Sequence, residues 1–266
     1  MYLEYWKFNK FPFENVPDPD FFYLSNSHEE GLTRLIYAAE MRKGSAMLSG
    51  DIGCGKTTLS MVYVRDLPPE KYDVGIIINP KLESVEFLQE ILYQFGIKDI
   101  PETKVKCLRA LNEKMLANMD AGKDTLLIVD EAQILNESTF EEIRLLLNFQ
   151  LNSRFLITII LIGQPELLTK VKGIEQLDQR IAIKYHLTPF NLKETSSYIL
   201  YRQQKAGGKV NVFSDEAIDR IYAHTGGVPR KINNLCDLSL LVGSSTKQKI
   251  INNKIVENII SDGALF

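Results

Sequence analysis

Mainly apolar runs alternate with helical patterns along the first 187 residues of the chain. The apolar runs lie at 45–49, 74–78, 125–129, 156–162 and 181–187. Short runs of this kind are typical of strands in a parallel sheet that is covered on both faces. Between them, apolar residues recur every three to four positions, as an amphipathic helix requires. The pattern therefore predicts an α/β domain in which five buried strands alternate with helices.

The pattern becomes purely helical after these runs. Asn191 and Ser214 begin two helical patterns, and each of these patterns ends at a pair of glycines. Pro229 suits the first turn of a third helix, because that position leaves its amide hydrogen unbonded and proline has none. We therefore expect two domains, with an N-terminal arm and α/β core at 1–187 and an α-helical lid at 188–266.

Two helix starts within the first domain rest on capping boxes, one from Ser27 to Glu30 and one from Thr139 to Glu142. Thr139 is followed three residues later by Glu142, and the side chains of such a pair satisfy each other's backbone amides. We expect a helix that begins at Thr139 and ends near Asn152.

A phosphate-binding loop pattern follows the first apolar run directly. Residues 50–58 read GDIGCGKTT, which fits G-x-x-x-x-G-K-T. The glycines let consecutive backbone amides face an anion, Lys56 can reach the β- and γ-phosphates, and the Thr57 hydroxyl can ligate Mg²⁺. The alternative, a glycine-rich turn that happens to precede a lysine, leaves the strand before it and the helix after it unexplained. The predicted nucleotide-binding residues are Gly50, Ile52, Gly53, Cys54, Gly55, Lys56, Thr57 and Thr58.

A later apolar run ends in Asp130 and Glu131, which matches the Walker B pattern. We expect Asp130 to hold Mg²⁺ together with Thr57, and Glu131 to orient and deprotonate the attacking water. Strand alternation predicts that the two carboxylates point to opposite faces, so that they do not compete for one role. The alternative, an acidic turn that closes a strand, is disfavoured downstream of a phosphate-binding loop.

Gln164 and Arg180 are candidates because of their positions at strand ends. Gln164 follows the fourth apolar run, and it would lie beside the γ-phosphate as sensor 1 if that strand separates the two Walker strands. Arg180 precedes the fifth run, where an arginine finger for a neighbouring subunit would stand. The alternatives are a turn glutamine and a surface arginine. A finger that acts on a neighbour requires an oligomer.

The arm and the lid each add one candidate. Prolines exclude a continuous helix in residues 1–27, yet this segment is rich in aromatic side chains that must be buried. We expect an extended arm that packs on the surface of the first domain, with its end near Leu24 approaching the adenine. Arg230, at the start of a lid helix, would reach the nucleotide across a cleft. Its alternative is a helix-surface arginine.

Composition narrows the class of protein. The 266 residues carry a net charge of −3, which argues against a protein that mainly coats nucleic acid. Residues 187–266 hold ten Lys and Arg against seven Asp and Glu, so the lid is mildly basic. The three cysteines form no C-x-x-C pair, which favours a reduced, cytoplasmic setting. The longest apolar run is too short for a membrane helix.

With these residues in place, the chain resembles the AAA+ ATPases. More closely, it resembles their ExeA/GspA-like branch, which includes the MshM-type pilus ATPases. The resemblance covers nearly the whole chain, and many blocks occur in the same order. The blocks that carry it are Pro17–Ser25, Ser27–Glu30, Gly50–Thr58, Asp130–Gln133, Leu145–Gln150, Gly163–Leu167, Gln179–Ala182 and Gly226–Leu235.

The resemblance implies an ATP-driven assembly factor of the type II secretion or type IV pilus machinery. It also implies the sheet order 5-1-4-3-2 with a helical lid over the nucleotide. Secretion members often continue through a membrane span into a periplasmic peptidoglycan-binding region. This chain reaches Phe266 with neither. We expect either the cytoplasmic part of a longer protein or a naturally short pilus-type member.

Three classes of function follow for this chain. The first is an oligomerising, ring-forming ATPase with ATP and Mg²⁺ as cofactors, which works with inner-membrane components of a secretion or pilus apparatus. The second is a DNA-associated regulator that resembles TnsC-type or origin-recognition ATPases, which the mildly basic lid favours and the net charge disfavours. The third is a nucleotide-gated scaffold with negligible turnover.

Overall fold

The computed structural model describes residues 2–151 and 154–263. Contacts between residues divide the described chain into two compact units. The core unit comprises 27–52 and 59–187, and the helical unit comprises 2–26, 53–58 and 188–263. The core unit ends at Leu187 and the helical unit resumes at Thr188. The hydrophobic pattern changes at the same point.

The core unit is built on a five-stranded parallel sheet with the order β2-β3-β6-β1-β7. Its strands are β1 (Ser45–Gly50), β2 (Tyr72–Ile77), β3 (Asp124–Val129), β6 (Ile157–Gly163) and β7 (Ile183–Leu187). Numbered along the chain, this is the order 5-1-4-3-2. The α/β class and the sheet order are therefore confirmed. The short strands β4 (Gln150–Leu151) and β5 (Arg154–Phe155) form a separate antiparallel pair.

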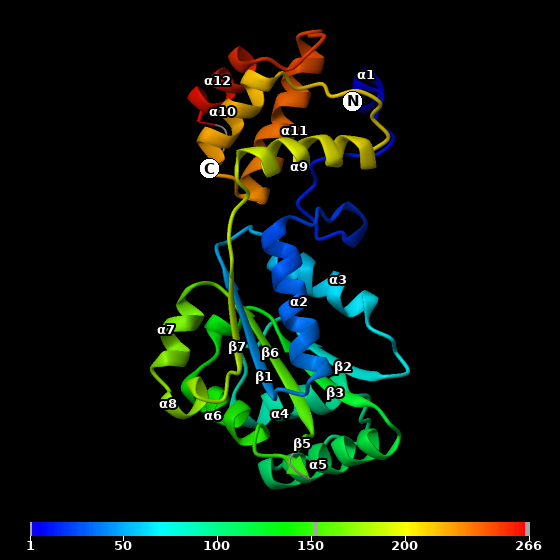
Figure 1. Ribbon diagram of the computed structural model, residues 1–266, viewed down its shortest axis with the longest axis vertical. Helices are drawn as coiled ribbons and strands as arrows, with labels where there is room; N and C mark the ends of the chain where they lie inside the picture. The colour runs from blue at the N-terminus through cyan, green and yellow to red at the C-terminus, as the bar shows by residue number, and fades with distance from the viewer. Residues whose placement is uncertain (1, 152–153, 264–266) are drawn as a thin grey trace. The chain divides into compact units, whose positions relative to one another are not determined.

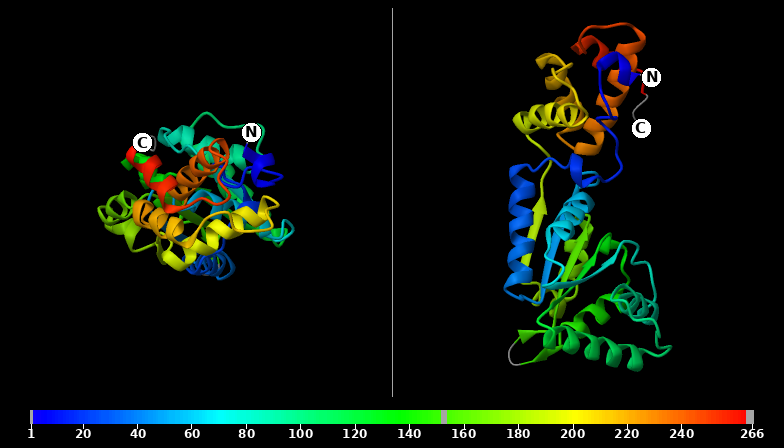
Figure 2. Two further views of the ribbon diagram at one scale, coloured as in Figure 1. Left: turned by 90° about the horizontal axis from the view of Figure 1, so that it is seen from above. Right: turned by 90° about the vertical axis from the view of Figure 1, so that its right-hand side faces the viewer.

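Helices cover both faces of this sheet. Helix α2 (Asn26–Glu40) and the 59–66 part of α3 (Lys56–Asp66) lie together on one face, where the Tyr63 hydroxyl donates to the Leu35 carbonyl. Right-handed crossovers put the helices between the later strands on the other face. They are α4 (Ser84–Gln94), α5 (Lys104–Asp120), α6 (Glu137–Leu146), α7 (Glu166–Lys172) and α8 (Glu175–Asp178). Figure 1 shows α2 in front of the strands, and the right-hand view of Figure 2 shows α2 and α5 on opposite sides of the sheet.

Parallel pairing aligns the carboxyl ends of the central strands. Ser49 of β1 pairs with Gly163 of β6, and Val129 of β3 pairs with Leu161 of β6. The segments that follow β1, β3 and β6 therefore leave the sheet at one edge.

The helical unit contains α9 (Leu192–Lys205), α10 (Asp215–Thr225), α11 (Pro229–Ser245) and α12 (Asn253–Ser261) (Figure 1). Asn191 and Ser214 cap the first two helices through their side chains, and Pro229 occupies the first turn of the third. These helix starts agree with the sequence prediction. None of the helices formed by the described residues combines the length and apolar character that a bilayer span requires.

The N-terminal arm belongs to the helical unit, which corrects its expected place on the first domain. It contains a short helix, α1 (Tyr2–Trp6), and a 3₁₀ turn, η1 (Pro19–Phe21). The buried aromatic side chains of the arm are Tyr2, Trp6, Phe8, Phe13 and Phe21, which share one apolar cluster with α9–α12. The Trp6 indole donates to the Leu240 carbonyl at 2.9 Å. The aromatics of the arm are therefore part of the core of the helical unit.

Neither capping box forms as expected. Helix α2 already begins at Asn26, so Ser27 lies inside the helix and is not its N-cap. Helix α6 begins at Glu137, and its N-cap is Asn136, three residues before Thr139, whose amide donates to the Asn136 side chain at 2.8 Å. The helix ends at Leu146 instead of near Asn152, and the β4–β5 pair follows it. Glu142 is therefore one turn too far along the helix to reach the cap.

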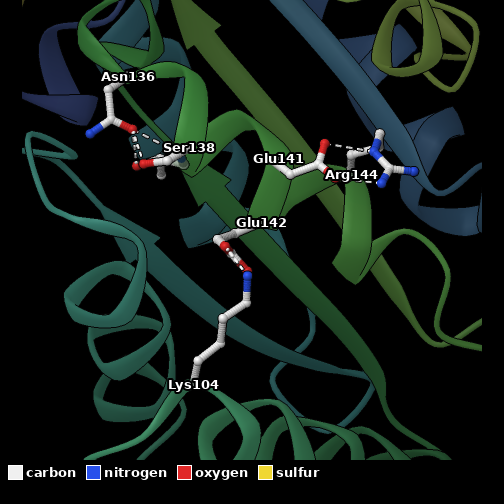
Figure 3. A network of polar contacts seen from close by, with 7 residues as sticks. Lys104, Asn136, Ser138, Glu141, Glu142 and Arg144 are labelled. Atoms are coloured by element: carbon white, nitrogen blue, oxygen red, sulfur yellow. Dashed lines mark hydrogen bonds and ion pairs between the residues drawn. The ribbon is translucent and has the colours of Figure 1, made fainter.

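Glu142 instead forms a buried ion pair that joins α5 to α6. Its side chain is 2% exposed, and its Oε1 accepts from the Lys104 ammonium at 2.5 Å (Figure 3). The second oxygen, Oε2, is buried and has no hydrogen-bond partner among the described residues. An acid buried in this way depends on its one cationic partner.

Replacing Lys104 with Met should destabilise the protein by about 1–3 kcal/mol, because Glu142 would remain buried without a partner. Lys104 is itself 41% exposed, so solvent screening keeps the loss toward the lower end. Urea denaturation followed by circular dichroism measures it. Replacing Glu142 with Leu in the same variant should recover most of the loss.

The matched control for this substitution is Arg144→Met, which breaks the more exposed Glu141–Arg144 pair on the same helix. Surface pairs contribute about 0–1 kcal/mol. Equal losses in Lys104→Met and Arg144→Met would contradict a special role for the buried pair.

Candidate functional site

The loop after β1 has the backbone geometry of an anion-binding turn. Strand β1 ends at Gly50, and helix α3 begins at Lys56. Gly53 and Gly55 adopt φ values of +83° and +89°, in the left-handed region that other residues rarely occupy. Cys54 and Lys56 are buried, whereas Ile52 is exposed. A helix N-terminus that follows such a turn presents backbone amides to a phosphate.

This loop contacts the start of α11 within the helical unit. The Arg230 amide donates to the Gly53 carbonyl at 3.2 Å. A Cβ atom added to Gly53 would lie 2.7 Å from the Arg230 Cβ and 3.3 Å from a Val228 methyl. Gly53 is therefore required here for two reasons, its positive φ and the close approach of α11.

The side chain of Arg230 is exposed. The expectation that its guanidinium reaches the nucleotide stays a prediction. Leu24, the candidate for the adenine, is half-exposed, with 48% of its surface accessible. Its expected role also stays a prediction.

Asp130 and Glu131 leave β3 at the carboxyl edge of the sheet. Asp130 is 3% exposed, its amide donates to the Ile77 carbonyl, and its Oδ1 accepts from the Glu131 amide at 2.8 Å. Strand β3 ends at Val129, and Glu131 has left-handed dihedrals of φ 50° and ψ 34°. A turn therefore sets the direction of the Glu131 side chain. The expectation that strand alternation separates the two carboxylates is wrong, because the strand has already ended.

Gln164 lies next to Glu131, from the neighbouring strand. Gln164 follows strand β6, which lies between β1 and β3, as the expected role of Gln164 requires. The side-chain amide of Gln164 donates to Glu131 Oε2 at 3.4 Å, near the upper limit for a hydrogen bond.

Gln133 completes this group, and sequence reasoning assigned it no role. Its Nε2 donates to Glu131 Oε2, and its Oε1 accepts from the backbone amide of Gln164 at 3.0 Å. The signal that could have found it is the Asp-Glu-Ala-Gln block, in which Gln133 follows the acidic pair by two residues. Glu131, Gln133 and Gln164 form one polar group at the carboxyl edge of β3 and β6, which we call the edge triad.

Arg180 lies at the opposite edge of the sheet. Its carbonyl accepts from the hydroxyl of Ser45, the first residue of β1. At about 3.3 Å per residue, roughly 16 Å of strand separate Ser45 from Gly50. Arg180 also lines an open depression of ≈ 470 Å³ with Gln150, Phe155, Gln176 and Gln179. It is thus remote from the carboxyl edge of its own core unit.

The two residues expected to hold Mg²⁺, Thr57 and Asp130, both carry oxygen donors. Among residues 2–151 and 154–263, no three His, Cys, Asp or Glu side chains converge into a metal-binding cluster. Mg²⁺ commonly uses one or two protein oxygens together with water and substrate phosphates. The Asp130 carboxylate and the Thr57 hydroxyl are each a donor of this type, and the expectation that they hold one Mg²⁺ together stays a prediction.

Comparisons with known proteins give a matching family and two relatives. Residues 39–171 match the family described as "AAA domain". General secretion pathway protein A of Aeromonas hydrophila is 34% identical over 259 residues, which are 96% of this chain and 47% of that protein. ATP-dependent target DNA activator B of Escherichia phage Mu is 28% identical over 173 residues, 64% of this chain and 51% of that protein.

A solved structure with the same fold is the Aeropyrum pernix ORC2 protein in its ADPNP–ADP complexes. It has a TM-score of 0.68 and 17% identity, and the match covers 95% of this chain and 71% of that one. At this identity the likeness concerns the fold alone. The chain spans about half the length of the two curated relatives.

Replacing Gly53 with Ala should weaken ATP binding by about tenfold or more, a loss of about 1.4 kcal/mol. The new Cβ would strain a left-handed residue and push against Arg230. Isothermal titration with ATP measures the affinity.

The control is Gly96→Ala, where φ is also positive (+76°) but no atom lies within 4 Å of the new Cβ. It should lose a similar strain energy of about 1–2 kcal/mol in stability, with unchanged ATP affinity. Equal ATP affinity in both variants would show that the loop tolerates displacement.

Proposed function

Because the chain belongs to the AAA domain family, we propose that it binds ATP with Mg²⁺ and hydrolyses the bond to the terminal phosphate. The observation that carries the proposal is the edge triad, in which two amides hold the Glu131 carboxylate at the carboxyl edge of the sheet. Ligands of α/β sheets generally bind outside this edge.

Each proposed catalytic residue has a separate role. Glu131 orients the attacking water and accepts its proton, and Lys56 neutralises charge on the β- and γ-phosphates. Thr57 and Asp130 would hold Mg²⁺, which would act as a Lewis acid toward the phosphates. Gln164 contacts the γ-phosphate as sensor 1. The backbone amides of the glycine-rich loop from Gly50 to Thr58 bind the remaining phosphate oxygens.

We propose further that hydrolysis requires a neighbouring subunit. Arg180 lies at the edge of its sheet that is opposite to Gly50, so it would not contact a nucleotide bound at the carboxyl edge of its own sheet. In an oligomer, Arg180 would neutralise the charge that develops on the phosphate bound by the next copy. Arg230 and Leu24 would contact the nucleotide from the lid and the arm.

The physiological role that we propose is assembly of a type II secretion or type IV pilus-like apparatus at the cytoplasmic face of the inner membrane. It is supported by the similarity to general secretion pathway protein A, which covers 96% of this chain. The partners would be inner-membrane components of that apparatus.

A second candidate function is control of assembly on DNA by the bound nucleotide. The similarity to ATP-dependent target DNA activator B favours it, and the net charge of −3 disfavours it. Duplex binding that falls steeply with rising salt would support this function. Absence of duplex binding at low salt would exclude it.

Replacing Glu131 with Gln should lower the hydrolysis rate by about 10²–10⁴-fold, because the general base is lost. ATP affinity should stay near that of the unmutated protein. Phosphate release and ATP titration measure the two quantities.

Lys56→Ala is the comparison variant, because it should lose ATP binding itself. If the concentrated, unmutated protein hydrolyses no ATP above background, the enzyme proposal fails and a nucleotide-gated scaffold takes its place.

Replacing Arg180 with Ala should lower the rate by about 10³-fold or more with ATP binding intact. The Gln179→Ala variant removes a neighbouring side chain from the same depression and should keep its activity. Mixing Arg180→Ala with Glu131→Gln protein should restore part of the activity. At some interfaces of the mixed oligomer, an intact Arg180 from one variant then faces an intact Glu131 from the other. Mixtures that stay inactive, or turnover independent of protein concentration, would contradict action across subunits.

A further inference from the structure

Gln133 is the member of the edge triad whose side-chain amide forms a hydrogen bond through both its nitrogen and its oxygen. It lies in the 3₁₀ turn η2 (Ala132–Ile134), which directly follows Glu131. Its nitrogen donates to the Glu131 carboxylate, and its oxygen accepts from the Gln164 backbone amide. A primary amide can do both, because its nitrogen donates and its oxygen accepts.

The end of β6 is shaped to admit this side chain. A Cβ atom added to Gly163 would lie 2.6 Å from Gln133 Oε1 and 3.2 Å from the Gln133 backbone nitrogen. The glycine before Gln164 therefore leaves the space in which Gln133 crosses from β3 to β6.

Glu131 needs such a support because its own backbone provides little. It has left the strand and occupies the left-handed region, which a non-glycine residue adopts at a cost of about 1 kcal/mol. A side chain on a turn is held mainly by the contacts of its head group. Of the two amides that contact the carboxylate, the Gln133 amide is the closer, and the Gln164 contact at 3.4 Å is weak.

We propose that Gln133 is a positioning residue, which fixes the Glu131 carboxylate and ties it to the backbone of Gln164. This proposal rests on the proposed ATPase function. It divides two tasks within the triad. Gln133 holds the general base, while the weakly held side chain of Gln164 is free to turn toward a phosphate without releasing that base.

The test replaces Gln133 with Leu, which has a similar size and no amide. Hydrogen bonds to charged groups contribute enough that kcat should fall about 10- to 100-fold. The KM for ATP and the directly measured ATP affinity should not change, because Gln133 supports only the base. A loss that comes only from unfolding would instead lower stability and reduce ATP binding.

The chain offers a matched control in Gln94. Its Nε2 donates to Glu90, and its Oε1 accepts from the Ile76 amide of β2, so that it also links a carboxylate to a strand. Gln94→Leu should lose stability without a selective loss of kcat. An unchanged kcat in Gln133→Leu, or equal losses in both variants, would overturn the proposal.

A second measurement does not depend on activity. Side-chain amide NMR of ¹⁵N-glutamine-labelled, nucleotide-free protein should show the Gln133 resonances moving when Glu131 is replaced with Leu. Replacement of the exposed Glu141 with Leu should leave them in place. Gln133 resonances that do not respond to Glu131→Leu would overturn the contact on which the proposal depends.

The outcomes separate the two proposals. If the unmutated protein hydrolyses no ATP, the proposed function fails, and the positioning role fails with it. If the unmutated protein hydrolyses ATP and Gln133→Leu keeps its kcat, only the positioning role fails.

Discussion

Parallel strand pairing is the constraint on which the rest of the core unit depends. Parallel neighbours cannot be joined by a tight turn, so each pair is separated by a crossover segment that includes a helix. The pairing of β1, β3 and β6 therefore gathers residues from distant parts of the sequence at one edge. Because these strands are buried on both faces, a slip of one residue would exchange their two sets of side chains and is strongly disfavoured. This rigidity gives Glu131 and Gln164 fixed starting points.

Much of this architecture was predictable from the sequence, because local and global signals agree. The five apolar runs match the five core strands, and the side chains of Asn191 and Ser214 cap helices where the hydrophobic pattern changes. Such signals depend on burial and on neighbours within one turn. Of the residues expected at the site, Glu131 and Gln164 lie side by side, because the predicted strand order requires it.

The features that the sequence did not predict depend on tertiary contacts. Thr139 and Glu142 form a good capping pattern, but Asn136 caps the helix and Glu142 pairs with Lys104. Gln133 gains its significance only when β6 brings the Gln164 amide beside it. The aromatics of the arm signal burial, but composition does not reveal which surface buries them.

Burial of the arm in the helical unit has a consequence for the time course of folding. Tyr2 hydrogen-bonds to Asp237, 235 residues later, so that this unit closes through contacts between residues far apart in the sequence. At about 5–20 residues per second, a ribosome needs roughly ten to fifty seconds to deliver the helices that cover the arm. The 27–187 segment can form its sheet during that interval. Meanwhile the arm exposes its aromatic side chains to chaperones and to the arms of other nascent chains.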